Sequence, residues 1–283
     1  MVSIVIPVYN AESFILETLE SVYTQSHQKF EIIIINDGST DSTRDILEKE
    51  AAKHSFIKLI HKENSGVADA RNIGMELAQG NYIALLDADD TWEKNNLEKK
   101  IKFLETNPEY SWVFSNMNCI AENSDFLRQH PEGRDDDILH NILLWEGEVV
   151  PGPCSNIVFA SSLKNSIAFD RTFSTAADQD FSIQLARTGK GKFLKDQLVN
   201  YRVLANSMSR DIATMERDHI AVYKKAALND LFGSAKFERK CFSNLYKILA
   251  GSWWNEGGKK LKGLKFIFKS IITYPPIVRK YFT

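Results

Sequence analysis

The sequence predicts an α/β fold in which a mostly parallel β-sheet carries helices on both faces, followed by a C-terminal helical extension. Short apolar runs alternate along the first half of the chain with segments whose apolar residues recur at helical spacing. Such alternation is typical of parallel sheets, because each helix returns the chain to the start of the next strand. The runs are continuously apolar rather than alternating, which indicates strands buried on both faces.

The elements of the first half follow in strict order. The expected strands are Val2–Val8, Phe30–Asn36, Ile57–His61, Tyr82–Leu86 and Tyr110–Asn116. Four helices are expected between these strands. The first follows Asn10, which would cap it, and the second begins at the Asp37–Asp41 turn and runs to about Lys53. The third spans residues 66–79, and the fourth ends before Asn107-Pro108.

The second half has a weaker pattern. Residues 119–152 are expected to be a largely irregular insertion, a natural place for acceptor specificity in an enzyme. The remaining expected elements are a short helix at Ile138–Trp145, a strand at Asn156–Ala160, a helix at Asp178–Arg187, short strands at Lys192–Leu194 and Leu198–Val203, and helices from Asp211 onward.

The stretch GNYIALLDADD at residues 80–90 ends a buried strand in three carboxylates, Asp87, Asp89 and Asp90. Carboxylates gathered at the carboxyl end of a parallel strand need a cation or a sugar hydroxyl to relieve their repulsion. One hypothesis is a divalent-metal and nucleotide site at Asp87 and Asp89. The alternative is an acidic turn that caps a helix starting near Glu93.

Two earlier strands also end in polar clusters, at Tyr9-Asn10 and at Asp37-Gly38-Ser39. Each cluster alone could be an ordinary turn. Because parallel strands present their carboxyl ends at one edge of the sheet, the fold is expected to bring all three clusters together there.

Composition is that of a globular protein, with 43% hydrophobic and 25% charged residues, but the charge is unevenly distributed. From Lys236 onward, 11 lysine or arginine residues accompany two acidic residues, a net charge of +9, against −11 for the first 235 residues. The tail is therefore expected to face an anionic surface. Nothing resembling a nucleic-acid-binding module accompanies it, so no nucleic-acid partner is expected.

The cysteines and the apolar segments predict a cytoplasmic protein. Three widely spaced cysteines, Cys119, Cys154 and Cys241, lack metal-ligand spacing and indicate reduced thiols. No signal peptide and no transmembrane helix are recognised. Neither G-x-G-x-x-G after the first strand nor a P-loop occurs, which argues against dinucleotide and P-loop sites.

Five stretches carry a family resemblance: VSIVIPVYNAE, IINDGSTDST, NSGVADARNIG, YIALLDADD and AADQDFSIQLAR, followed by LVNYRVLANSMS. In this order and spacing they resemble the family 2 glycosyltransferases with the GT-A fold. The resemblance is strong over residues 1–116 and moderate over residues 156–210. It implies inverting transfer of a sugar from a nucleotide diphosphate donor, UDP-linked in most members, with Mn²⁺ or Mg²⁺ as cofactor.

The resemblance also implies roles for individual residues. Asp37 would bind the uracil, Asp87 the ribose, and Asp89 the cation that bridges the diphosphate. The full nucleotide-binding set implied is Pro7, Val8, Tyr9, Glu12, Asp37, Arg71, Asp87 and Ala88. Hard cations favour carboxylate and phosphate oxygens, which suits Asp89 as the metal ligand.

Inversion requires a base that takes the proton of the acceptor hydroxyl. The resemblance points to Asp178, with Asp180 second, while the alternative for both acids is capping of a helix N-terminus. The chain has Ala177 where the family usually has Glu, and Leu204 where relatives often have a His that assists the metal or diphosphate. Arg202 or Arg210 could substitute for that His.

The expected organisation is a GT-A domain over residues 1–210, with a nucleotide-binding half (1–116) and an acceptor half (117–210), and a basic, aromatic-rich helical region over residues 211–283. The acceptor would be a glycan or a lipid-linked molecule in cell-surface polysaccharide synthesis. Two alternatives remain open. The first is a haloacid dehalogenase-type phosphatase with Asp87 in its Asp-x-Asp-x-Thr loop; the second is a nucleotide-binding relative without turnover.

Lys259–Ile272 (KKLKGLKFIFKSII) could form a helix with Leu261, Leu264, Phe268 and Ile271 on one side. A basic helix with bulky apolar residues suits an anionic bilayer surface, which would place the protein on the inner face of the cell membrane through residues 237–283. The alternative is that this apolar face packs on the catalytic domain while the lysines face water.

Overall fold

A computed structural model describes residues 1–204 and 211–281 of the chain. Its strands are β1 (Val2–Val8), β2 (Phe30–Asp37), β3 (Ile57–Lys62), β4 (Tyr82–Leu85), β5 (Thr91–Trp92), β6 (Trp112–Ile120), β7 (Phe126–Gln129), β8 (Val158–Ala160) and β9 (Gly191–Arg202). Its α-helices are α1 (Ile15–Tyr23), α2 (Thr43–Lys53), α3 (Val67–Leu77), α4 (Asn96–Thr106), α5 (Ile138–Leu144), α6 (Ala177–Thr188), α7 (Ile212–Leu228), α8 (Ala235–Asn255) and α9 (Lys260–Thr273). Short 3₁₀ turns are η1 (Cys154–Asn156), η2 (Ser161–Leu163) and η4 (Pro275–Tyr281).

The strands form one mixed sheet in the order β3-β2-β1-β4-β8-β6-β9-β5, with β7 paired to β6. The four strands β3, β2, β1 and β4 are parallel, as the alternating sequence predicts. Beyond them β8 runs antiparallel to both β4 and β6, and β6 and β9 are again parallel. The carboxyl ends of β1, β2 and β4, with their polar clusters, therefore share one edge.

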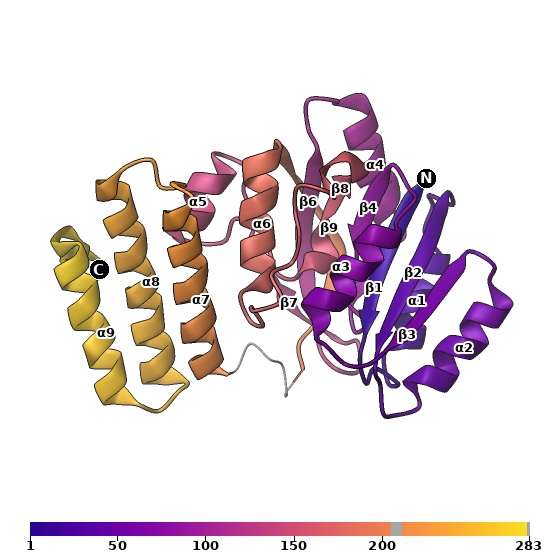
Figure 1. Ribbon diagram of the computed structural model, residues 1–283, viewed down its shortest axis with the longest axis horizontal. Coiled ribbons are helices and arrows are strands. Elements are labelled where there is room, and N and C mark those ends of the chain that lie inside the picture. Colours follow the sequence, from indigo (N-terminus) through magenta and orange to yellow (C-terminus); the bar gives the residue numbers. More distant parts are fainter. Residues whose placement is uncertain (205–210, 282–283) are drawn as a thin grey trace.

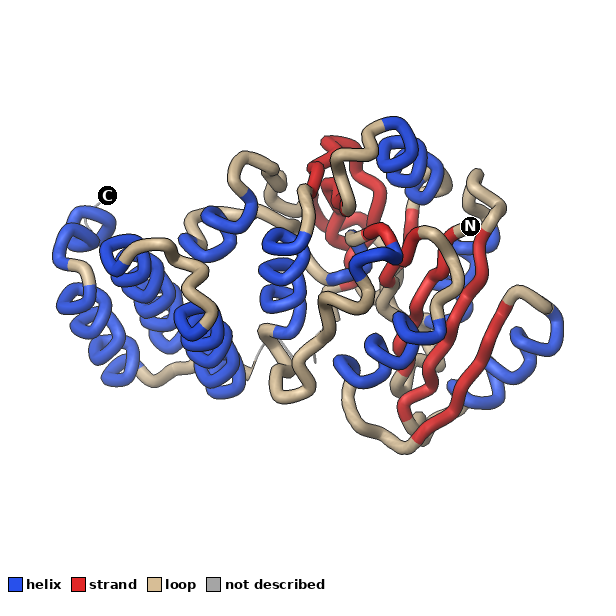
Figure 2. The backbone as a smooth tube through the Cα atoms, turned by 45° about the horizontal axis from the view of Figure 1, so that its top comes forward, coloured by secondary structure: helices blue, strands red, loops and turns tan. Residues whose placement is uncertain are grey.

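Both faces of the sheet are buried, as the apolar runs predict. Along β1, Val5 joins a core that includes α3 and α6, whereas Ile4 and Ile6 join a core with α1, α2 and α4. Helices cover the strands from both sides (Figure 2). The α3 helix lies so close to β1 that a Cβ on Gly74 would meet Val5 at 2.2 Å, so glycine is needed there.

Several sequence expectations were wrong in detail. Asn10 does not cap α1; its side chain accepts a hydrogen bond from the Thr40 N–H at 2.8 Å instead. The helix expected near Glu93 begins only at Asn96, after the short strand β5, so the acids at 87–90 do not cap it. The two short strands expected between 192 and 203 are one continuous strand, β9, and β7 was not anticipated.

The C-terminal helices α7, α8 and α9 lie side by side, with α9 at the edge of the molecule farthest from β1–β3 (Figure 1). Tyr223 of α7 donates to the Leu143 carbonyl, and Asn244 of α8 donates to the Leu144 carbonyl, which ties the helices to α5. The division of the chain at residue 210 stays a prediction. Within residues 1–204 and 211–281, no helix combines the length and apolar character required to cross a bilayer.

Asn156, in the η1 turn before β8, binds groups of β6 and α4 through its side chain. Its fully buried side chain accepts from the Ser115 N–H (3.0 Å) and from the Lys100 ammonium (3.2 Å) and donates to the Ser115 carbonyl (2.5 Å). Asn156→Ala removes the partners of the Ser115 N–H and carbonyl and leaves the Lys100 ammonium with the backbone carbonyl of residue 156 at 2.8 Å, so we expect a loss of about 3 kcal/mol in the free energy of unfolding. Urea unfolding followed by circular dichroism measures it; a loss below about 1 kcal/mol would contradict this account.

Candidate active site

Arg71 joins two carboxylates that lie far apart in the sequence. Its guanidinium donates from Nη1 to Asp178 Oδ1 and from Nη2 to Asp87 Oδ1, both at 2.6 Å. Arg71 belongs to α3, Asp87 follows β4, and Asp178 lies in the first turn of α6. No side chain caps α6, so the capping alternative does not describe Asp178, whose carboxylate binds Arg71.

Arg71 is held rigidly. It is 3% exposed, and its guanidinium lies 4.9 Å from the centre of the Phe169 ring, which stacks on Phe181 of α6 at 4.1 Å. Burial alone would lower the pKa of Arg71, but the carboxylates of Asp178 and Asp87 outweigh it and raise that pKa well above its usual value. The guanidinium is therefore a permanent cation between two acids.

The acids after β4 have unusual ionisation. Burial and the nearby Asp178 raise the pKa of Asp87, although Arg71 opposes this. Burial and the charge of Asp87 raise the pKa of Asp89 to about 6. Asp89 makes no ion pair within the described part of the chain, so none of the described basic side chains neutralises its carboxylate by direct contact.

The described residues fit a cation shared with a ligand rather than a closed metal site. In residues 1–204 and 211–281, no three His, Cys, Asp or Glu side chains converge as a metal-binding group. Mg²⁺ in nucleotide sites is usually held by one or two carboxylates together with phosphate oxygens and water. Asp89, a carboxylate with a raised pKa and no cationic partner in contact, suits that arrangement.

The third acid, Asp90, anchors the loop that carries the other two. It is 1% exposed and accepts from the Ser155 hydroxyl at 2.6 Å and from the Arg202 N–H at 2.9 Å. The same Ser155 oxygen accepts the Asp87 N–H at 2.9 Å. Burial and the charges of Asp89 and Asp87 raise the pKa of Asp90 well above its usual range. Sequence reasoning missed Ser155, which no motif marks.

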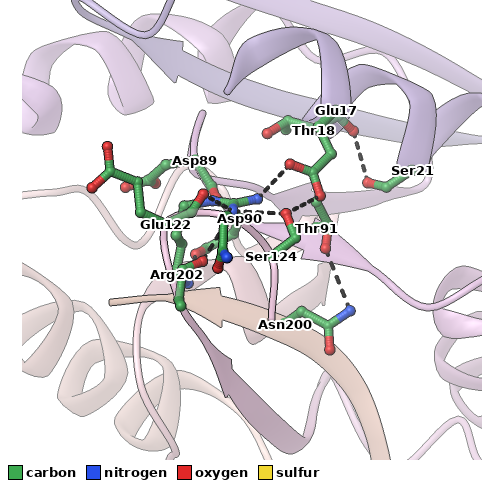
Figure 3. A network of polar contacts seen from close by, with 12 residues as sticks. Glu17, Thr18, Ser21, Asp89, Asp90, Thr91, Glu122, Ser124, Asn200 and Arg202 are labelled. Atoms are coloured by element: carbon green, nitrogen blue, oxygen red, sulfur yellow. Dashed lines mark hydrogen bonds and ion pairs between the residues drawn. The ribbon is translucent and has the colours of Figure 1, made fainter. Parts of the chain in front are cut away.

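Arg202 secures the same loop from the other side (Figure 3). Its side chain is fully buried and donates to the Asp89 carbonyl at 2.7 Å, the Glu17 carboxylate at 2.7 Å, the Glu122 carbonyl at 2.8 Å and the Ser124 hydroxyl at 2.9 Å. These contacts engage all of the guanidinium nitrogens. Arg202 therefore positions the backbone of Asp89, a role different from the direct assistance considered from sequence.

Two other positions considered with Arg202 add nothing to this picture. Leu204 is the last described residue before the gap, and it is partly buried. Arg210, the other residue considered as a substitute for the missing His, lies outside the described residues.

The remaining residues implied for the nucleotide line the same edge of the sheet. Pro7 and Val8 are buried at the end of β1, and Tyr9 beyond them is 51% exposed. Ala88 accepts a hydrogen bond from the Thr18 hydroxyl of α1 at 2.9 Å through its carbonyl. An exposed aromatic ring at this edge is available to a ligand.

Asp37 and Glu12 accept hydrogen bonds from backbone N–H groups of neighbouring loops, and neither contacts Arg71. Asp37 accepts from the Ser65 and Gly66 N–H groups at 2.9 and 2.8 Å and pairs with Lys62, which fixes the loop between β3 and α3. Glu12 accepts the Ser42 N–H at 2.8 Å at the start of α2. Their implied roles toward a nucleotide stay predictions.

Asp180, the second candidate base, faces away from Asp178 toward α7. It is 3% exposed and accepts from Gln184 at 2.7 Å and from Lys225 at 2.9 Å. Lys225 also pairs with Asp170 at 2.9 Å, so this group ties α6 to α7. The structure does not bring Asp180 together with Asp87 and Arg71.

A cavity of about 170 Å³ opens beside Asp178. Its lining includes Trp145, which stacks on His219 at 4.7 Å, and Glu148, whose pKa is raised by burial. Gln179 also lines it, and the Gln179 Oε1 atom is buried with no hydrogen-bond partner among the described residues. The cavity thus combines an aromatic ring, a carboxyl and an unused acceptor next to the candidate base, a mixture typical of small-ligand pockets.

Removing Arg71 tests whether it holds the site together. Arg71→Met leaves Asp87 and Asp178 without their shared cation, and we expect the free energy of unfolding at pH 7.5 to fall by about 3 kcal/mol. Arg44→Met, which breaks a surface pair of an arginine side chain 61% exposed, is the control and should cost less than about 0.5 kcal/mol. Equal effects of the two substitutions would contradict the account.

Comparison with known proteins identifies the family. The family described as Glycosyl transferase family 2 matches residues 3–165. The putative teichuronic acid biosynthesis glycosyltransferase TuaG of Bacillus subtilis is 34% identical over 215 residues, covering 74% of this chain and 81% of that protein. By contrast, the matched segment spans only 18% of an uncharacterized glycosyltransferase of Rickettsia bellii, with 44% identity over 133 residues.

Solved structures share the fold. S. aureus TarS 1-349 in complex with UDP-GlcNAc aligns with a TM-score of 0.63 at 17% identity, covering 99% of this chain and 91% of that one. The mannosyltransferase PcManGT from Pyrobaculum calidifontis, in complex with GDP-Man and Mn²⁺, aligns with a TM-score of 0.63 at 19% identity, covering 96% and 75%. The family match over more than half of the chain and the likeness to TuaG over most of both proteins lead to one conclusion: this chain belongs to glycosyl transferase family 2 and has the GT-A fold.

Proposed function

We propose that this chain is an inverting glycosyltransferase that moves a sugar from a UDP-sugar to a hydroxyl of a glycan or lipid-linked acceptor. The observation that carries the proposal is the Arg71 bridge, which holds the end of β4 and the candidate base Asp178 in one site. The name of TuaG, a putative teichuronic acid biosynthesis glycosyltransferase, supports a role in polysaccharide synthesis. The proposal places this synthesis at the cell surface and the protein at the cytoplasmic face of the membrane. The TarS complexes with UDP and UDP-GlcNAc favour UDP as the nucleotide.

The proposed reaction is a single displacement. Asp178 takes the proton from the acceptor hydroxyl while the oxygen of that hydroxyl attacks the anomeric carbon of the donor sugar. The bond from this carbon to the diphosphate oxygen breaks on the opposite face, and UDP leaves. Arg71 orients the carboxylate of Asp178, which keeps 34% of its side chain exposed to an incoming acceptor. Asp180 is not chosen as the base, because it is buried and bound to Lys225.

A divalent cation, Mn²⁺ or Mg²⁺, completes the proposed site. Asp89 would hold it together with the diphosphate of the donor, and Asp90, Ser155 and Arg202 would keep Asp89 in place. When bound, the cation neutralises charge that develops on the leaving UDP. The PcManGT complex with GDP-Man and Mn²⁺ supports a divalent metal in this fold.

The cavity beside Asp178 is the proposed place for the acceptor. It adjoins the candidate base, and the Trp145 ring offers an apolar surface of the kind on which sugars pack. Glu148 and the unpartnered Gln179 oxygen supply polar contacts for hydroxyl groups. The cavity is small beside pockets of about 300–1,000 Å³ for drug-sized ligands, so it suits a single ring.

The two alternatives receive less support. A phosphatase with Asp87 as nucleophile gives no role to the bridge that Arg71 makes between Asp87 and Asp178. Family membership favours glycosyl transfer over phosphate release as well. A relative without turnover would bind UDP but would not transfer sugar. Turnover of the unmodified chain, which the next experiment measures beside its variant, distinguishes this alternative from an active enzyme.

Asp178→Asn tests the assignment of the base. Asparagine keeps the size of the side chain but cannot accept the proton at neutral pH, so we expect kcat to fall by about 10²–10⁴. The affinity for UDP, measured by calorimetry, should stay within about twofold. The control is Asp136→Asn, at a side chain that is 76% exposed. Release of UDP from UDP-sugars measures turnover, and full activity of Asp178→Asn would exclude Asp178 as the base.

The raised pKa of Asp89 predicts pH-dependent metal binding. A proton competes with the cation for this carboxylate, so the affinity for Mn²⁺ in the presence of UDP should rise as pH increases through about 6 and level off above it. Between pH 5 and pH 7 we expect a gain of about tenfold, read from the Mn²⁺-induced shift in Tm. Asp89→Asn should remove this gain. A Tm shift of equal size at both pH values in the unmodified chain would contradict the role of Asp89.

A further inference from the structure

The α9 helix has two unlike faces. Its inner face packs on α8, where Gly263, Phe266 and Ser270 are buried. Ser270 donates to the Ser243 carbonyl at 2.7 Å, and the Ser243 hydroxyl donates to the Ser270 carbonyl at 2.8 Å. These reciprocal bonds fix the rotation of α9 about its axis, and they determine which side chains point outward.

The outer face of α9 is apolar and exposed. Four large side chains recur at helical spacing along it: Leu261 is 78% exposed, Leu264 48%, Phe268 67% and Ile272 63%. The sequence predicted an apolar face of four residues, and three of them, Leu261, Leu264 and Phe268, are exposed. The fourth exposed residue is Ile272, whereas the sequence predicted Ile271. The idea that this face packs on the catalytic domain was wrong.

The turn between α8 and α9 carries one exposed aromatic residue. Trp254 of α8 is 41% exposed, and its ring lies against Gly263 on the inner face of α9. Because α9 also forms the outer edge of the molecule, none of the described helices or strands lies beyond it (Figure 1). A contiguous apolar surface of this kind marks a site of interaction.

The charges around this face identify its partner. Lys260 lies over the Trp254 ring, Lys265 is exposed among the apolar side chains, and α9 contains no acidic residue. A second copy of the same face would bring like charges together, which disfavours self-association. An anionic lipid surface satisfies both features, because its acyl region accepts the apolar side chains and its headgroups attract the lysines.

We propose that the outer face of α9, formed by Leu261, Leu264, Phe268 and Ile272, docks the protein on an anionic bilayer with α9 lying in the plane of the interface. This inference depends on the proposed function in one respect: docking would hold the candidate active site close to an acceptor carried by the membrane. The binding itself needs neither donor nor acceptor, so it is measured independently of catalysis.

Sedimentation with lipid vesicles tests the proposal on the full chain. We expect binding to vesicles of phosphatidylcholine and phosphatidylglycerol, at least tenfold weaker binding to pure phosphatidylcholine, and weaker binding at high salt. The variant Leu264→Glu/Phe268→Glu should lose at least tenfold in affinity. Both side chains are exposed, so this variant should keep its fold, as checked by Tm. Leu228→Glu, at an 89% exposed residue of α7, is the matched control and should bind as the unmodified chain does.

Two results would overturn the proposal. One is equal vesicle binding by the double variant and the unmodified chain, or no binding by either. The other is a dimer in light scattering that the double variant converts to a monomer, which would assign the face to self-association. The Tm shift produced by UDP and Mn²⁺ on the same proteins reports the donor site separately. If UDP and Mn²⁺ produced no Tm shift in the unmodified chain, this result would count against the proposed function and not against membrane docking.

Discussion

The site depends on one buried cation between two acids. Without Arg71, the carboxylates of Asp87 and Asp178 would face each other across a poorly solvated site, where like charges resist ionisation. With it, the end of the fourth strand and the first turn of α6 are drawn to one guanidinium, each at 2.6 Å. Phe169 beneath the guanidinium keeps it from turning away. The edge proposed to bind the nucleotide and the proposed base are thus joined by one side chain.

A second set of contacts makes the acidic loop rigid. Asp90 takes hydrogen bonds from Ser155 and from the backbone of Arg202. The Arg202 side chain donates to the Asp89 carbonyl (Figure 3). The loop therefore has two buried anchors, from η1 and from β9. Among the described residues, Asp89 is the member of the acidic triplet whose carboxylate makes no ion pair, which suits a residue that shares a cation with a ligand.

Local patterns predicted much of this structure. Apolar runs such as Val2–Val8 gave strands close to their observed ends, because burial on both faces leaves a continuous signal. The ordered motifs predicted a site that contains Arg71, Asp87, Asp89 and Asp178, and the structure joins Arg71, Asp87 and Asp178 by direct contacts. Sequence reasoning could not place β8 between β4 and β6, because that antiparallel pairing depends on contacts far apart in the chain. Ser155 was missed for the same reason, and the outward side of α9 was set by how Ser270 meets Ser243.

The proposed catalytic site and the proposed docking face lie in different parts of the molecule, because α9 forms the edge that is farthest from β1–β3 (Figure 1). The central claim is that Arg71, Asp87, Asp89 and Asp178 form one donor site. Anomalous diffraction from a crystal soaked with UDP-GlcNAc and Mn²⁺ tests it most directly. The account predicts a manganese peak bound by Asp89 and the diphosphate, with Arg71 still bridging Asp87 and Asp178. A manganese-bound nucleotide located away from Asp89, or an Arg71 that contacts neither acid, would contradict it.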